Sequence, residues 1–222
     1  RKLFHNVSHE IRSPLARIEV ATDLAKLDPS RVPASLERIE KEVRAIDELI
    51  GSLLTYARLE GGIVLETATV SARAFLGAFE AQSRGVEVKL VDRLTEDITL
   101  EVNEAALSSA LINIGRNALR FTPERGTITL AVELRAKGLL IRCIDEGPGM
   151  SEEELARMFD PFVRGNREHT GTGFGLGLAI AKSAVASQHG TLSAKNVLPH
   201  GLEFEITLPV QTENGSLKKA AV

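Results

Sequence analysis

Hydrophobic residues in the first sixty positions recur every three or four residues. In the second half of this stretch they fall at Leu36, Ile39, Val43, Ile46, Ile50, Leu53 and Ala57. This spacing places them in one stripe along an α-helix, as in a coiled coil. A less regular stripe of the same period precedes it, and residues 27–33, which contain two prolines, separate the two. Because proline disfavours helix continuation, we predict a hairpin of two antiparallel helices over residues 1–61.

A single helical hairpin of this size buries few apolar side chains. The first helix also carries apolar residues outside its stripe, such as Leu3, Val20 and Leu24. A second copy of the hairpin would cover these faces and complete a four-helix bundle. We therefore expect a homodimer through residues 1–60. The alternative is a hairpin that packs on the rest of its own chain.

Beyond Gly61 and Gly62 the helical period gives way to shorter runs. Alternating or β-branched runs predict strands at 63–70, 86–91, 98–102, 127–135, 138–145, 191–196 and 202–208. Helical patterns lie at 71–83, 104–120, 152–158 and 175–188. This mixture predicts an α+β layer sandwich over residues 62–210, with one sheet covered by helices on one face. Residues 211–222 lose periodicity, and we expect a disordered tail there.

Composition narrows the class of protein. Apolar residues make up 43% of the chain and aromatic residues only 4%, so the core is mainly aliphatic. The 27 basic and 30 acidic residues are interleaved and give no basic surface for nucleic acid. The single cysteine, Cys143, excludes an intrachain disulfide and fits a reducing compartment. No apolar run approaches the roughly 20 residues of a membrane span. The chain opens inside a helical pattern, so we expect a cytoplasmic fragment of a longer protein.

One histidine stands off the apolar stripe of the first helix. His9 lies on a different side of the helix from Ile11, so its imidazole should face solvent. The adjacent Glu10 can accept the Nδ1 proton, leaving the Nε2 lone pair to attack an electrophile. Pro14 removes the amide that would bond the carbonyl of Glu10, which predicts a bend one turn beyond His9. His9 is therefore a candidate nucleophile, although an ordinary solvent-facing histidine gives the same pattern.

Two asparagines lie four residues apart on the predicted helix 104–120. Asn113 and Asn117 share one face of it. Their amide oxygens suit a hard cation such as Mg²⁺ that also binds phosphates. Arg120 lies near the same face and can meet phosphate charge, and Phe121 can cover a base. Two solvated amides are the alternative.

Two glycine-containing motifs complete a candidate nucleotide pocket. Asp145 follows an apolar strand and can accept a hydrogen bond from an exocyclic amine such as that of adenine, and Gly147 and Gly149 allow a turn to approach a ligand closely. A plain acidic turn fits the same residues. The run Gly173-Phe174-Gly175-Leu176-Gly177 precedes an apolar helix, whose N-terminal amides favour an anion.

A polar stretch from Arg164 to Thr170 precedes that run and is predicted to form a lid. Arg164 and Arg167 are its candidates for contact with a γ-phosphate. Solvated lid charges are the alternative.

Taken together, these motifs resemble the sensor histidine kinases of bacterial two-component systems. The H, N, G1, F and G2 boxes of that family are similar to residues 9–15, 113–122, 145–149, 159–162 and 173–178. Five motifs in family order are specific together, and the resemblance covers residues 3–210. It implies a dimerisation and histidine-phosphotransfer bundle followed by a Bergerat-type ATP-binding domain, a fold shared with gyrase-like and mismatch-repair ATPases.

The resemblance also implies chemistry. It implies autophosphorylation of His9 by ATP and transfer to an aspartate of a response regulator, with Glu10 as base. Asn117 would hold Mg²⁺ with help from Asn113, and Asp145 would hold the adenine amine. Arg120 stands where the family often has Lys and keeps the charge. The family's sensor and membrane segments are not in this sequence, so we expect the full-length protein to be anchored in the inner membrane.

Two positions depart from the family pattern. Ser13 stands where many relatives have Thr or Asn, a residue that orients water for dephosphorylation of the regulator. Serine keeps a hydroxyl, so a regulator phosphatase activity stays open, even as the main activity. Phe174 replaces the usual small hydroxyl residue of the G2 box. A docking scaffold that binds nucleotide without transfer, and a gyrase-like ATPase, are the remaining alternatives.

Overall fold

The computed structural model describes residues 2–62, 66–73, 86–95, 98–136, 138–164 and 173–210, and for residues 2–5 the backbone alone. Most of the predicted helix 71–83, the lid with Arg167 and the predicted tail 211–222 lie outside these ranges. Among the described helices, none combines the length and the apolar character that a membrane span requires.

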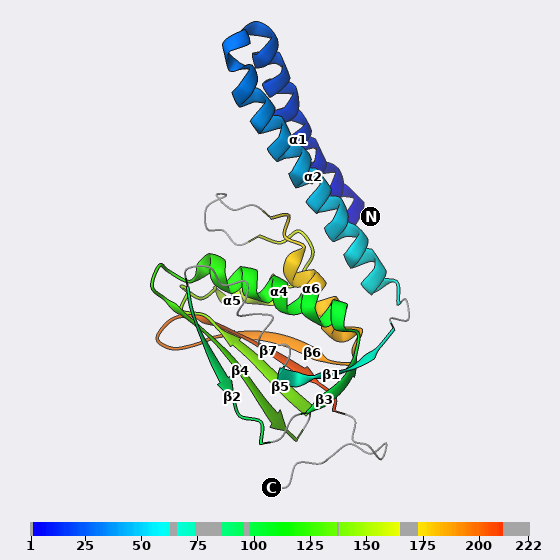
Figure 1. Cartoon of the computed structure of the whole chain (residues 1–222), viewed down its shortest axis with the longest axis vertical. Coiled ribbons are helices and arrows are strands. Elements are labelled where there is room, and N and C mark those ends of the chain that lie inside the picture. The colour runs from blue at the N-terminus through cyan, green and yellow to red at the C-terminus, as the bar shows by residue number, and fades with distance from the viewer. Residues whose placement is uncertain are drawn as a thin grey trace.

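The first sixty residues form the predicted antiparallel hairpin (Figure 1). Helix α1 spans Lys2–Leu27, a 3-10 turn spans Pro29–Arg31, and α2 spans Val32–Glu60. Pro14 lies inside α1, which remains one helix. The expectation that both linker prolines interrupt the helices is wrong for Pro33. It lies in the first turn of α2, where its missing amide leaves no hydrogen bond unmade.

The face that α2 buries differs from the predicted stripe. Its buried residues are Ser35, Glu42 and Leu49, spaced by seven. About half of the predicted stripe remains exposed, with relative accessibilities of 54% for Leu36, 52% for Val43 and 44% for Ile50. The hairpin therefore has an apolar row that the described chain leaves uncovered.

The second half of the chain contains two sheets among its described residues, so the prediction of one sheet is wrong. Strands β2 (Glu87–Asp92), β4 (Thr127–Arg135), β5 (Gly138–Ile144), β7 (Leu202–Leu208) and β6 (Thr191–Asn196) form a five-stranded sheet in that spatial order. Strands β2 and β4 are parallel, and the other neighbours are antiparallel. Strands β1 (Ala68–Ser71) and β3 (Thr99–Val102) pair separately.

Helices cover one face of the five-stranded sheet, as predicted (Figure 1). They are α4 (Glu104–Phe121), α5 (Glu152–Arg157) and α6 (Gly177–Ala186). Helix α4 begins where the Asn103 side chain accepts a hydrogen bond from the Ala106 amide at 2.8 Å. Its buried side, with Leu107 and Ile114, packs in one core with Phe204 of β7. This packing fixes α4 above the sheet, and with it the two asparagines on the helix.

The C-terminal half of α2 packs against the second domain. Leu49 of α2 forms a buried cluster with Leu176 and Ile180, and Phe174 packs against it. The hydroxyl of Ser183 on α6 donates to Glu60 at 2.6 Å. The hairpin thus does rest on its own chain, through this half of α2 and through Ile11 of α1, which packs on the same cluster.

Candidate active site

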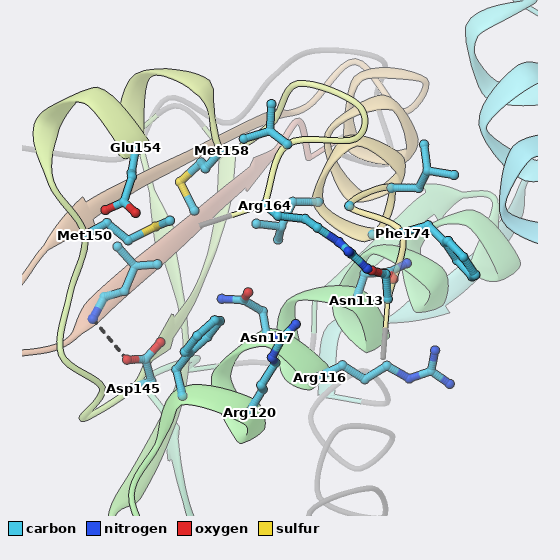
Figure 2. A pocket seen from close by; sticks show the side chains of 18 of the residues that line it. Asn113, Arg116, Asn117, Arg120, Asp145, Met150, Glu154, Met158, Arg164 and Phe174 are labelled. Atoms are coloured by element: carbon cyan, nitrogen blue, oxygen red, sulfur yellow. Dashed lines mark hydrogen bonds between the residues drawn. The ribbon is translucent and has the colours of Figure 1, made fainter. Parts of the chain in front are cut away.

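A cavity of about 280 Å³ opens between α4, the turn after β5 and the loop before α6 (Figure 2). Eleven residues predicted from the sequence line it: Asn113, Asn117, Arg120, Phe121, Asp145, Gly149, Arg164, Gly173, Gly175, Leu176 and Gly177. Gly147, also predicted, donates its amide to Asp145 and is not part of the lining. Segments that are far apart in sequence therefore meet at one concave site.

Asp145 lies at one end of the cavity (Figure 2). It is only 2% exposed, and its Oδ1 accepts hydrogen bonds from the amides of Gly147 at 2.8 Å and Leu202 at 3.2 Å. Burial raises the pKa of the Asp145 carboxyl, and these two bonds offset part of that rise. The backbone thus holds the carboxylate in a fixed orientation.

Gly147 is required by a close approach of two segments. A Cβ atom there would lie 2.7 Å from Asp145 Oδ1 and 3.1 Å from the carbonyl oxygen of Phe121. The turn after β5 and the end of α4 are therefore in contact, which brings Phe121 beside Asp145.

The asparagines of α4 lie in the middle of the cavity (Figure 2). The side-chain amide nitrogen of Asn113 donates to the carbonyl of Ser109 at 2.9 Å. Its Oδ1 faces Gly177, where an added Cβ would come within 2.8 Å of it. The start of α6 thus lies directly against Asn113, and a larger residue there would have to displace the Asn113 side chain.

The loop before α6 is held by the segment that follows α5. The amide of Phe162 donates to the carbonyl of Gly175 at 2.9 Å. Phe162 has a φ of 66°, a conformation that is strained for a residue with a side chain. Arg164 hydrogen-bonds through Nη2 to the carbonyl of Gly173. These contacts place the glycine loop and an arginine at the end of the cavity opposite Asp145.

Arg120 and Phe121 line the cavity next to each other. The Arg120 guanidinium lies 5.3 Å from the centroid of the Phe121 ring, within reach of a cation–π contact. This places a positive charge between Asp145 and the glycine loop.

The predicted nucleophile lies outside the cavity, on the exposed surface of α1. His9 is exposed and Glu10 is partly buried, so the prediction that the imidazole faces solvent is confirmed. Ser13 is also exposed, and its hydroxyl accepts a hydrogen bond from Arg17 at 2.7 Å. The chain therefore carries the histidine and the pocket as two separate features.

Comparison with protein-family models assigns both parts of the chain. Residues 102–212, half of the chain, match the histidine kinase-, DNA gyrase B- and HSP90-like ATPases. Residues 1–62 match the His Kinase A (phospho-acceptor) domain. The chain belongs to the sensor histidine kinase family. In that family the first domain is the phospho-acceptor and the second is the ATP-binding domain.

Individual relatives agree with this family assignment. The chain is 36% identical over 217 residues to the sensor protein PfeS of Pseudomonas aeruginosa, covering 94% of this chain and 47% of the relative. It is 34% identical over 218 residues to the sensor histidine kinase CpxA of Escherichia coli K12, covering 95% and 47%. The chain thus spans about half the length of the curated relatives it matches.

Solved structures of histidine kinases share the fold. Full-length ShkA in complex with AMPPNP superposes with a TM-score of 0.70 at 27% identity, over 98% of this chain and 47% of that one. The histidine kinase AdeS of Acinetobacter baumannii gives a TM-score of 0.68 at 19% identity, over 92% and 98%. The second likeness concerns the fold alone.

Several residues that line the cavity were not predicted from the sequence. Arg116 lines it one helical turn after Asn113, and this three-residue spacing was a usable signal. Met150 and Met158 also line the cavity and contribute apolar side chains to it. Glu48 and Ser52 come from α2, and no local pattern could have assigned them to a site on the other domain.

The cavity offers amide oxygens to a metal ion. Within the described ranges, no three of His, Cys, Asp and Glu come together in a metal-binding group. The side chains of Asn113 and Asn117 supply neutral oxygen donors instead. Such donors fit Mg²⁺ when phosphate oxygens complete its coordination, and they do not fit a transition metal held by the protein alone.

Proposed function

We propose that the chain is the ATP-dependent autokinase core of a two-component sensor kinase, with residues 1–61 as dimerisation and phosphotransfer unit and residues 62–210 as ATP-binding domain. One observation carries this proposal. A buried carboxylate at one end of the cavity faces arginines and a glycine loop at the other end, in a chain that also exposes His9 beside Glu10. This polarity suits a nucleotide with its base at Asp145 and its phosphates at the loop.

The base end accepts adenine through Asp145. Two backbone amides already bond Oδ1, so Oδ2 is the atom that accepts from the exocyclic amine. The Met150 and Met158 side chains and the Phe121 ring supply apolar contact for the purine. A base with a carbonyl at that position, such as guanine, would leave Asp145 without a donor.

The phosphate end combines charge and backbone amides. Arg116, Arg120 and Arg164 line the cavity, and Arg164 bonds the carbonyl of Gly173 in the glycine loop. The N-terminus of α6 presents free amides there, and its dipole favours negative charge. Asn117, with Asn113, would hold Mg²⁺, and the ion would supply neutralisation of phosphate charge.

The chemical step is a phosphoryl transfer to an imidazole. Nε2 of His9 attacks the γ-phosphorus, the bond from phosphorus to the β–γ bridging oxygen breaks, and ADP leaves with that electron pair. Glu10 accepts the Nδ1 proton in a hydrogen bond and so offsets the positive charge that develops on the ring. The phosphoryl group then passes from Nε2 to an aspartate of a response regulator.

The uncovered row on α2 supports a homodimer. Leu36, Val43 and Ile50 form an apolar row at heptad spacing. A second hairpin can bury this row in a four-helix bundle. His9 and Ser13 are both exposed on α1, the position that a docking receiver domain requires. Ser13 carries a second proposed activity, orientation of a water that dephosphorylates the regulator.

Labelling with γ-³²P-ATP and Mg²⁺ tests the autokinase. We expect acid-labile, base-stable phosphate on the parent chain and on His200→Gln, which changes an exposed histidine remote from the H box. His9→Gln should lose at least about 99% of the label, because no other group replaces the nucleophile. Label that persists on His9→Gln would show that the site is wrong. Free phosphate without any labelled chain would favour a gyrase-like ATPase instead.

A further inference from the structure

The Ser13 hydroxyl is linked through Arg17, on its own helix, to Glu42 on the other helix of the hairpin. The hydroxyl accepts a hydrogen bond from Arg17 Nη1 at 2.7 Å. The same guanidinium donates from Nε to Glu42 Oε1 at 2.8 Å and from Nη2 to Glu42 Oε2 at 2.7 Å. Both carboxylate oxygens of Glu42, on α2, are engaged. This two-point pairing fixes the plane of the guanidinium, and therefore the direction of Nη1.

Other hydroxyl residues of the hairpin behave differently. Thr22 and Thr55 donate to the carbonyl oxygen four residues earlier, at 2.8 and 2.9 Å. This is the usual arrangement of a hydroxyl inside a helix. The equivalent acceptor for Ser13 is the carbonyl of His9 itself. Arg17 instead donates to the Ser13 oxygen, and this bond restricts the orientation of the hydroxyl.

Arg17 and Glu42 form an ion pair. Glu42 is only 7% exposed, although it is charged. The hydrogen bond from Arg17 is the main cause that lowers the pKa of the Glu42 carboxyl, so the carboxylate is ionised wherever the kinase works. The Glu10 carboxylate also acts electrostatically on Arg17, to a smaller extent than Glu42. Arg17 thus lies between the buried Glu42 and the two H-box residues Glu10 and Ser13.

We propose that Arg17 and Glu42 are positioning residues that set the Ser13 hydroxyl for dephosphorylation of the regulator. This rests on the phosphatase part of the proposed function. With one lone pair taken by Arg17, the hydroxyl has one proton and one lone pair left for a water molecule. That water attacks the phosphorus of the aspartyl phosphate, and the bond from phosphorus to the carboxylate oxygen breaks. The aspartate leaves as carboxylate, and the water's oxygen and protons go to inorganic phosphate and solvent.

A double-mutant cycle on the whole chain tests the pair. The probe is the receiver domain that takes labelled phosphate fastest from the phosphorylated chain, purified in its phosphorylated form. The rate of phosphate release is measured with ADP and Mg²⁺ for the parent, Arg17→Gln, Glu42→Gln, Ser13→Ala and Ser13→Ala/Arg17→Gln. We expect each single variant to lose about tenfold or more, since each removes or misdirects one charge-assisted hydrogen bond. The double variant should be no slower than Ser13→Ala.

The controls separate positioning from folding. Arg44→Gln removes an exposed ion pair with Glu40 on the same helix and should change the release rate less than twofold. Thermal unfolding and ATP binding of Arg17→Gln report whether the hairpin and the pocket are intact. Ser13→Thr keeps a hydroxyl and should retain the dependence on Arg17.

The possible outcomes distinguish failure of the positioning proposal from failure of the proposed phosphatase activity. If Ser13→Ala slows release but Arg17→Gln and Glu42→Gln do not, the positioning proposal is overturned and the phosphatase stands. An Arg17→Gln effect of the same size in the Ser13→Ala background also overturns it, because Arg17 would then act without Ser13. If the parent chain releases no phosphate, or if Ser13→Ala releases it as fast as the parent, the phosphatase activity is overturned and the positioning proposal falls with it.

Discussion

At the scale of single residues, the nucleotide pocket depends on a carboxyl group held in an unfavourable environment. Asp145 is buried, and its pKa is raised by that burial. Its two backbone hydrogen bonds compensate for part of this cost but leave Oδ2 toward the cavity. Such a residue stabilises a ligand better than it stabilises the fold.

Asp145→Asn should separate the contribution of this carboxylate to ATP binding from its effect on the stability of the fold. Asparagine retains an oxygen for the amides of Gly147 and Leu202, but its side-chain NH2 group would face the adenine amine as a second donor. We expect ATP affinity to fall about tenfold to hundredfold, the value of one hydrogen bond to a charged group, in calorimetric titration. Glu146→Gln, at the exposed neighbouring carboxylate, should leave affinity within twofold. Unchanged ATP binding by the Asp145→Asn chain would contradict the base assignment.

The same variant has a predictable dependence on pH. The folded chain holds the Asp145 proton more tightly than the unfolded chain, because its pKa is raised on folding. Asp145 therefore lowers the free energy of unfolding progressively as pH rises from the ordinary aspartate range through the raised pKa. The free energy of unfolding of Asp145→Asn, relative to the parent, should rise over that window and then level off.

The sequence predicted the residues of this pocket well because their signals are local. Asp145 follows an apolar strand, and Asn113 and Asn117 share a helical face, so spacing alone brings them to one side. Arg17 and Glu42 were missed because their contact depends on the rotation of α1 against α2, across 25 residues. Glu48 and Ser52 were missed because they reach the cavity from the other domain.

At the scale of elements, the hairpin has more apolar surface than it buries within the described chain.

Six of the seven strands were predicted to within about a residue at each end, because alternation reports which side chains face a core. It does not report which strands pair, which is why the separate β1–β3 sheet was not foreseen. In the same way, the period of α2 gave its apolar stripe but not which part α1 would cover.

Val43→Glu tests what covers the remaining row. Val43 is 52% exposed within the chain, so the hairpin should keep its helix content in circular dichroism. In a four-helix bundle the new carboxylate would be buried, at a cost of several kcal/mol. We therefore expect the dimer dissociation constant from sedimentation equilibrium to rise at least about a hundredfold. Leu198→Glu, at a residue that is 97% exposed, is the control and should remain dimeric.

At the scale of the whole molecule, the two domains touch at the phosphate end of the cavity. Phe174, inside the glycine loop, packs on the cluster around Leu49 of α2, and Ile11 of α1 packs on the same cluster. Leu176 belongs both to that cluster and to the wall of the cavity. The glycine loop is therefore in contact with the helix pair that carries His9, which lies two residues before Ile11.

The most direct measurement is the location of the transferred phosphate. The chain is incubated with ATP and Mg²⁺, digested at neutral or basic pH, and sequenced by electron-transfer tandem mass spectrometry. We predict phosphate on the imidazole of His9 in the parent, and no phosphopeptide from this segment with His9→Gln. Phosphate on any other residue, or a phosphorylated first helix in the His9→Gln chain, would contradict the account.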